Sequence, residues 1–204
     1  KVIDIVTNAV DRDRTILVSS AISGCTDTLI KIGTLASQRD ESYKALIDEL
    51  QHKHHVIIKD FLPREKQEES KEVCDGLFDS LRSIAQGVFL LGELSPASLD
   101  AIQGFGELWS TKILATKLAS IGIATKWIDS RQIIRTVAKG DKNIVDVQKT
   151  YARVNEMLES NPITQLFVLP GFIASDNDSR PRRLRLHSIA ICCRLQGAQP
   201  RDLD

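Results

Sequence analysis

The spacing of apolar positions changes several times along the chain, and each change marks a predicted element. Apolar residues at positions 2, 3, 5, 6 and 10 follow helical spacing, so the first ten residues predict a helix. The β-branched and apolar run Thr-Ile-Leu-Val that starts at Thr15 predicts a buried strand. Helical spacing returns over 26–36, 41–60 and 65–92, the last with an apolar stripe of Leu77, Leu81, Ile84 and Val88.

The second half of the chain alternates between the two patterns. Ser95 and Pro96 are typical of a helix N-cap and first position, and a further helix is predicted over 105–122. The remaining predicted elements are a strand over 123–129, a helix over 143–160 and a strand over 164–172. Alternating strands and helices indicate an α/β fold with a mostly parallel sheet. The block 41–104 is then a helical insertion between the first two strands.

Composition and charge argue against two classes of function, nucleic-acid binding and membrane association. Apolar residues make up 42% of the chain, and Lys+Arg and Asp+Glu both number 27, so the formal net charge is zero. A balanced charge argues against bulk attraction to nucleic acid or to an anionic membrane. No run approaches the roughly 18 apolar residues of a membrane span, and the four cysteines fit neither a zinc site nor a redox pair. We therefore expect a cytoplasmic protein with reduced thiols.

Small and hydroxyl residues follow the first predicted strand, in the sequence SSAISGCTD of residues 19–27. Open α/β sheets bind small charged ligands at this kind of strand-to-helix junction. Gly24 permits close approach of a ligand to the backbone, and the N–H groups of the next helix favour an anion. The alternative is that Ser23 or Thr26 caps that helix. Spacing alone leaves both interpretations open.

Other polar residues carry weaker signals. Glu107 follows Gly106, and its carboxylate either complements the dipole of a first helical turn or faces a substrate ammonium group; the sequence alone favours the dipole. The polar stretch 170–179 follows the last strand, and most such stretches are connections. The HKHH cluster of residues 52–55 has no acid or cysteine to complete a metal site, so it predicts a solvated helix face. Trp109 and Trp127 are expected in the core.

Three stretches become specific in combination, namely ILVSSAISGCTDTLI, GFGELWSTKILATKLASIGIATKWIDSRQIIRT and FVLPGFIASD. They are similar, in order and rough spacing over residues 1–181, to a V-S-A-x-x-G-x-T-[DN]-x-L stretch, a G-E-x-x-S helix, an A-x-x-[IL]-D strand and a Q-G-F-I-x loop. These are motifs of the amino-acid kinase family. Within that family the chain resembles the aspartokinases most, especially the kinase part of bifunctional aspartokinase–homoserine dehydrogenases.

The resemblance implies a fold, a reaction and a site. The fold is a three-layer α/β/α sandwich, and the reaction transfers the γ-phosphoryl group of ATP, used with Mg²⁺ in the family, to the β-carboxylate of L-aspartate. Carried over by position, Ser20 and Thr26 lie at the aspartate pocket and Glu107 meets the substrate ammonium. Gly171 and Phe172 close the pocket. Members of the family often pair through helices of this lobe, so a homodimer is expected, with no nucleic-acid or membrane partner.

The chain also departs from the family pattern. The family opens with a K-F-G-G-T-S-V strand whose lysine contacts phosphates, whereas this chain starts inside the predicted helix that should follow it. Where the family continues with T-T-L-G-R-G-G-S-D-Y-T-A-A, residues 182–204 read RRLRLHSIAICCRLQGAQPRDLD. We interpret 1–181 as an N-terminal lobe without its first strand, and 182–204 as an atypical tail, hypothetically an out-of-frame reading. Without either phosphate-handling motif, the chain is expected to bind ATP poorly and to be catalytically impaired.

Two other functions compete with this interpretation. The first is an amino-acid kinase for acetylglutamate, glutamate or a nucleoside monophosphate, although Glu107 would face no cation on a substrate that lacks an ammonium group. The second is a non-catalytic dimerisation or association module, since exposed sheet edges and apolar faces favour partners.

Overall fold

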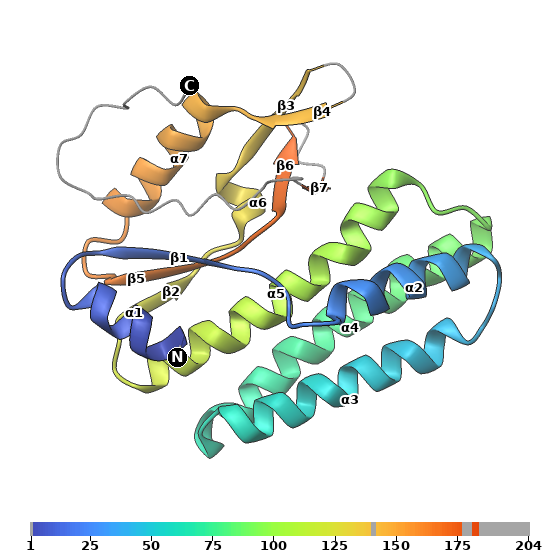
Figure 1. Cartoon of the computed structure of the whole chain (residues 1–204), viewed down its shortest axis with the longest axis horizontal. Coiled ribbons are helices and arrows are strands. Elements are labelled where there is room, and N and C mark those ends of the chain that lie inside the picture. The colour runs from blue at the N-terminus through green and yellow to red at the C-terminus, as the bar shows by residue number, and fades with distance from the viewer. Residues whose placement is uncertain (1, 140–141, 177–180, 184–204) are drawn as a thin grey trace.

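The computed structural model describes residues 2–139, 142–176 and 181–183, and these form a layered α/β part and a helical part (Figure 1). The helical part contains α2 (Cys25–Ser37), α3 (Tyr43–Phe61), α4 (Arg64–Leu91) and the first half of α5 (Pro96–Ser120). The second half of α5 continues into the layered part. Within this described part of the chain, none of the helices combines the length and apolar character that crossing a bilayer requires.

A parallel sheet forms the centre of the layered part. Its strands are β1 (Thr15–Ser19), β5 (Leu166–Pro170) and β2 (Thr125–Trp127), in the order β1-β5-β2. Alternate residues of β5 face opposite layers: Leu166 and Val168 pack towards α1 (Val2–Val10) and α5, whereas Phe167 and Leu169 pack towards α6 (Ser130–Ile133) and α7 (Val147–Glu159). Because both faces are covered, the central strand is apolar throughout. The predicted three-layer α/β/α sandwich is confirmed.

The helical part has its own apolar core. The buried positions of α4 repeat at helical spacing, and they are Cys74, Phe78, Leu81, Ala85 and Val88. The predicted stripe therefore has the right period, but Leu77 and Ile84 lie at its edge and are only partly buried. The helices α2, α3, α4 and α5 contribute to one continuous cluster, so the predicted insertion over 41–104 joins α2 and the rest of α5 in a single lobe.

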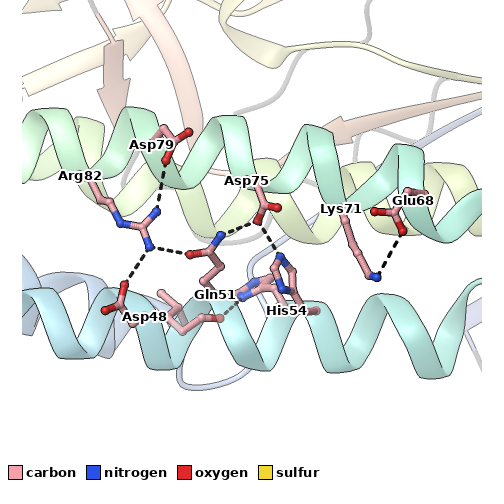
Figure 2. Close-up of polar contacts among 10 residues, drawn as sticks. Asp48, Gln51, His54, Glu68, Lys71, Asp75, Asp79 and Arg82 are labelled. Atoms are coloured by element: carbon pink, nitrogen blue, oxygen red, sulfur yellow. Dashed lines mark hydrogen bonds and ion pairs between the residues drawn. The ribbon is translucent and has the colours of Figure 1, made fainter.

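A polar seam joins α3 and α4 on the outside of this core (Figure 2). Arg82 Nη2 lies 2.8 Å from Asp48 Oδ1 and also donates to Gln51. Gln51 donates in turn to Asp75, whose Oδ1 lies 2.6 Å from His55 Nε2. These side chains are partly exposed, so each ion pair contributes little to stability.

His54 contradicts the prediction that the HKHH cluster is a solvated helix face. The side chain of His54 is only 2% exposed, although the neighbouring His52 is exposed as predicted. Residue 54 shares the inward face of α3 with Leu50 and Ile58, four residues to either side, and its Nδ1 lies 2.8 Å from the Leu50 carbonyl oxygen. The His54 ring packs at 4.8 Å between centroids against Trp109, which is buried as predicted.

Two predicted boundaries were wrong. The separate helices expected at 95–98 and 105–122 are one helix, α5, with Ser95 as its N-cap, accepting a hydrogen bond from the backbone of Ser98. The helix continues through Gly104 and Gly106, and close packing explains Gly106, as described below. The helix expected over 143–160 begins only at Val147, after the N-cap Asp146.

A second sheet, which the sequence did not predict, lies beside the first. It comprises β3 (Arg135–Lys139), β4 (Lys142–Val145), β6 (Ile173–Asp176) and β7 (Pro181–Arg183), in the order β4-β3-β6-β7. The stretch expected to be a polar loop therefore contains a strand, β6, with Ile173, Ala174 and Ser175 all buried. The atypical tail begins within β7, and its residues 184–204 lie outside the described residues.

Candidate functional site

The carboxyl ends of β1 and β5 meet the middle of α5, and the predicted site residues lie around this junction. The chain leaves β1 at Ser19, turns through residues 20–24 and enters α2 at Cys25. The helix α5 crosses this turn so closely that a Cβ atom on Gly106 would lie 2.8 Å from the Cβ of Ala21. Ser110, one turn further along α5, donates a hydrogen bond of 2.8 Å to the carbonyl oxygen of Ser20.

Glu107 is held at this crossing. Its side chain is 1% exposed, and it lies well past the first turn of α5, so the interpretation as a dipole-complementing acid is wrong. Burial, followed by the charge of Glu107, raises the pKa of the Cys25 thiol to about 12. That electrostatic effect means that the carboxylate lies near the start of α2. A buried acid and the turn after β1 therefore form one unit.

The turn itself has the features of an anion site. Gly24 is the N-cap of α2, with φ of 78°, so neither Ser23 nor Thr26 caps the helix as the alternative proposed. The first N–H groups of an α-helix have no partner inside the helix and attract negative charge. Thr26 lies in this first turn and is partly buried, whereas Ser20 is exposed at the other end of the turn. Both hydroxyl residues therefore flank the same turn.

The turn after β5 completes the junction. The N–H of Gly171 donates a 2.7 Å hydrogen bond to the carbonyl oxygen of Ser19, and a Cβ at Gly171 would lie 3.2 Å from that oxygen. The N–H of Ile173 donates back to the Gly171 carbonyl oxygen at 2.7 Å, which defines a γ-turn centred on Phe172. Phe172 has φ of 56°, an unfavourable conformation for an aromatic residue. Phe172 is 36% exposed.

Several residues that support this junction were not among the predicted site residues. Thr111 donates a 2.7 Å hydrogen bond to the Glu107 carbonyl oxygen and accepts one of 2.9 Å from Trp127 Nε1. Ser130 donates to the carbonyl oxygen of Pro170. Only Ser110 had a signal in the sequence, as the serine of the G-E-x-x-S motif. The others depend on contacts between residues far apart in the chain.

Metal ligands and reactive thiols are not features of this junction. Among residues 2–139, 142–176 and 181–183, no group of three or more His, Cys, Asp or Glu side chains is placed to hold a metal ion. Cys25 and Cys74 are free and buried. Burial, followed by the charge of the nearby Asp75, raises the pKa of the Cys74 thiol to about 12. Both thiols therefore stay protonated at neutral pH and act as small core residues.

Comparison with known proteins identifies several bifunctional aspartokinase/homoserine dehydrogenases as relatives. The chain is 26% identical over 174 residues to the chloroplastic bifunctional aspartokinase/homoserine dehydrogenase 1 of Zea mays, covering 85% of this chain and 19% of that protein. It is 26% identical over 188 residues to the chloroplastic enzyme 2 of Arabidopsis thaliana, covering 91% and 20%. The Escherichia coli enzyme 2 is 25% identical over 161 residues. The chain thus spans about a fifth of the length of these relatives.

Solved structures agree on the fold. The structure of E. coli aspartokinase III in complex with aspartate and ADP superimposes with a TM-score of 0.75 at 22% identity, covering 89% of this chain and 40% of that one. Clostridium acetobutylicum aspartate kinase gives a TM-score of 0.64 at 15% identity, covering 91% and 38%. A sequence model of the amino acid kinase family matches residues 1–190. The chain belongs to the amino acid kinase family.

Proposed function

We propose that this chain is the aspartate-binding lobe of an aspartokinase. The observation that carries the proposal is the burial of the Glu107 carboxylate against the turn after β1. The ammonium group of an amino acid is a cation that such a carboxylate can bind. The E. coli neighbour was solved with aspartate and ADP, which supports the choice of ligand.

Each predicted site residue then has a role. Glu107 pairs with the ammonium group of L-aspartate, and the first turn of α2, with Ser20 and Thr26, binds a carboxylate. Gly171 allows the turn after β5 to lie close to the end of β1, and Phe172 covers the ligand. These groups bind and orient the acceptor, so that its β-carboxylate can receive the γ-phosphoryl group of ATP and release ADP.

We further propose that the 204 residues alone catalyse poorly. The family motifs K-F-G-G-T-S-V and T-T-L-G-R-G-G-S-D, which handle the phosphates, do not occur in this sequence. Positive and amide groups that stabilise the transferring phosphoryl group account for much of the rate in such enzymes. The binding of ATP and Mg²⁺ therefore requires groups other than those of the aspartate site. A hydroxamate assay with ATP and aspartate is expected to detect no turnover, and robust aspartyl phosphate formation would contradict this.

Isothermal titration with L-aspartate tests the binding proposal. Glu107→Gln removes the charge at nearly constant shape and is expected to weaken binding at least tenfold, about 1.4 kcal/mol or more. Glu156→Gln, on the exposed side of α7, is the matched control and should leave affinity unchanged. N-acetyl-L-aspartate lacks the ammonium group, so equal affinity for it and for L-aspartate would refute the role of Glu107. Stronger binding of acetylglutamate would favour the alternative amino-acid kinase.

The assembly and boundaries of the protein are also proposals. A homodimer in the cytoplasm remains our prediction, and light scattering with and without aspartate tests the dimer. A dimer that forms without any aspartate binding would favour the association module. Residues 1–181 as the lobe and 182–204 as an out-of-frame tail are tested by the nucleotide sequence of the gene. If no shifted frame encodes Leu-Gly-Arg-Gly-Gly-Ser-Asp, the frame hypothesis is wrong.

A further inference from the structure

A cavity separate from the strand-end junction lies between α4, α5 and β2. Its volume is about 160 Å³, and its apolar walls include Val73, Leu77, Ile113 and both tryptophans, Trp109 and Trp127. Residues 107 and 109 of α5 are related by a rotation of about 200°, so their side chains point about 160° apart around the helix axis. The cavity is therefore on a different side of α5 from Glu107. Its size is below the roughly 300–1,000 Å³ of sites for drug-sized ligands, so only a small molecule fits it.

Groups of opposite charge line the same cavity. Lys112 comes from α5, and its Nζ lies 3.7 Å from the centre of the Trp127 ring, a cation–π contact that fixes the side chain. Burial lowers the pKa of Lys112, and the nearby Asp129 opposes that shift. Glu69 lines the cavity from α4, with its side chain 71% exposed and paired with Lys66 at 3.2 Å. The positive group is thus the more buried of the two, and the negative group is nearer to solvent.

We propose that this cavity binds an α-amino acid with an apolar side chain, such as L-leucine. Lys112 pairs with the ligand carboxylate, Glu69 with the ligand ammonium, and the apolar side chain packs on Trp109 and the aliphatic wall. Lys112 already covers the face of Trp127, so a purely cationic ligand finds no free aromatic face there. A second carboxylate, as in aspartate, would lie unpaired among apolar side chains.

The thiol of Cys74, which also lines the cavity, is not expected to react covalently with a ligand. Cys74 lines the cavity, but it is 3% exposed and its pKa is raised to about 12, so it stays a thiol at neutral pH. The proposed ligand is therefore held without a covalent bond. This inference does not rest on the proposed kinase function, because it uses neither Glu107 nor the turn after β1.

Intrinsic fluorescence tests the proposal directly, because the two tryptophans of the chain both line the cavity. Titration with L-leucine at millimolar concentrations is expected to give a saturable change in emission. Lys112→Met should weaken that binding about tenfold or more. Lys117→Met is the matched control on the same helix, since Lys117 packs against Phe61, and it should leave the affinity unchanged.

Ligand analogues test the proposal on the unaltered chain, whatever the variants do to folding. The carboxylate 4-methylpentanoate and the amine 3-methylbutylamine each lack one charge of leucine and are expected to bind at least several-fold more weakly. Equal affinity for either analogue would overturn the zwitterion assignment. A leucine titration without any change in fluorescence, and without heat in calorimetry, would overturn the site. Neither result would bear on aspartate binding, which Glu107→Gln tests separately.

Discussion

Gly106 offers the sharpest test of how the site is built. An alanine Cβ at this position would lie 2.8 Å from Ala21 Cβ, 3.3 Å from Cys25 Sγ and 3.4 Å from Leu29 Cδ1. The Ala21 Cβ is attached directly to the backbone, so no side-chain rotation can relieve the clash. Gly106→Ala must therefore move α5 away from the turn after β1, and Glu107 moves with it.

The expected size follows from two opposing effects. Alanine is favoured over glycine inside a helix by up to about 1 kcal/mol, whereas overpacking a tight contact costs about 1–3 kcal/mol. Gly76→Ala in α4 isolates the first effect, because no described atom lies within 4 Å of a Cβ added there. We expect Gly76→Ala to stabilise the chain. The Gly106→Ala variant should be less stable than the Gly76→Ala variant by the overpacking cost. Each kcal/mol of that cost lowers the Tm by about 2–4 °C.

Thermal unfolding followed by circular dichroism measures this difference, and calorimetry with L-aspartate measures the effect on the site. Gly106→Ala is expected to lower both the Tm relative to Gly76→Ala and the affinity for aspartate. Gly76→Ala should raise the Tm and leave the affinity unchanged. If Gly106→Ala raises the Tm as much as Gly76→Ala and keeps full affinity, the close crossing of α5 over the turn does not exist.

Two further predictions concern the helical part. Burial holds the pKa of His54 below its usual 6.5. Below pH 6.5 the unfolded chain therefore binds more protons than the folded chain. The free energy of unfolding should decrease as the pH is lowered, by at most about 1.4 kcal/mol per pH unit. Urea unfolding above and below pH 6.5 measures this slope; His54→Leu should reduce it and His52→Leu should not. Arg82→Ala breaks the ion pair to Asp48, whose side chain is 68% exposed, so we expect a loss below about 1 kcal/mol in urea unfolding; a loss of several kcal/mol would show that the polar seam carries the helix pairing.

Regular patterns explain which parts of the fold were predictable. The helix α4 repeats its buried positions over many turns, and β1 and β5 are short apolar runs, so each element is encoded in its own sequence. The strands of the second sheet lack such signals. β6 was mistaken for a loop because Ser175 and Asp176 are polar, yet Ser175 is buried, donating a hydrogen bond to the Arg131 carbonyl oxygen and accepting one from Arg135. Only the folded chain provides those partners.

The site was predictable only as a combination of motifs. Locally, Glu107 is a glutamate after a glycine, and an acid in a first helical turn is the common reason for that pattern. Its burial depends on α5 continuing through Gly104 and Gly106 and on the contact between Gly106 and Ala21. No local periodicity encodes a contact over that separation. The strained conformation of Phe172 likewise follows from the hydrogen bond that ties Gly171 to Ser19.

The helix α5 belongs to two apolar clusters at once. Its residues Ile102, Phe105 and Trp109 complete the core of the helical part, and Ala115 and Leu118 pack beneath the parallel sheet. One uninterrupted ladder of backbone hydrogen bonds therefore runs through both cores. Opening either core removes the packing from one half of a helix that both cores share, so we expect the lobe to melt as one cooperative unit and not as a bundle and a sandwich in succession.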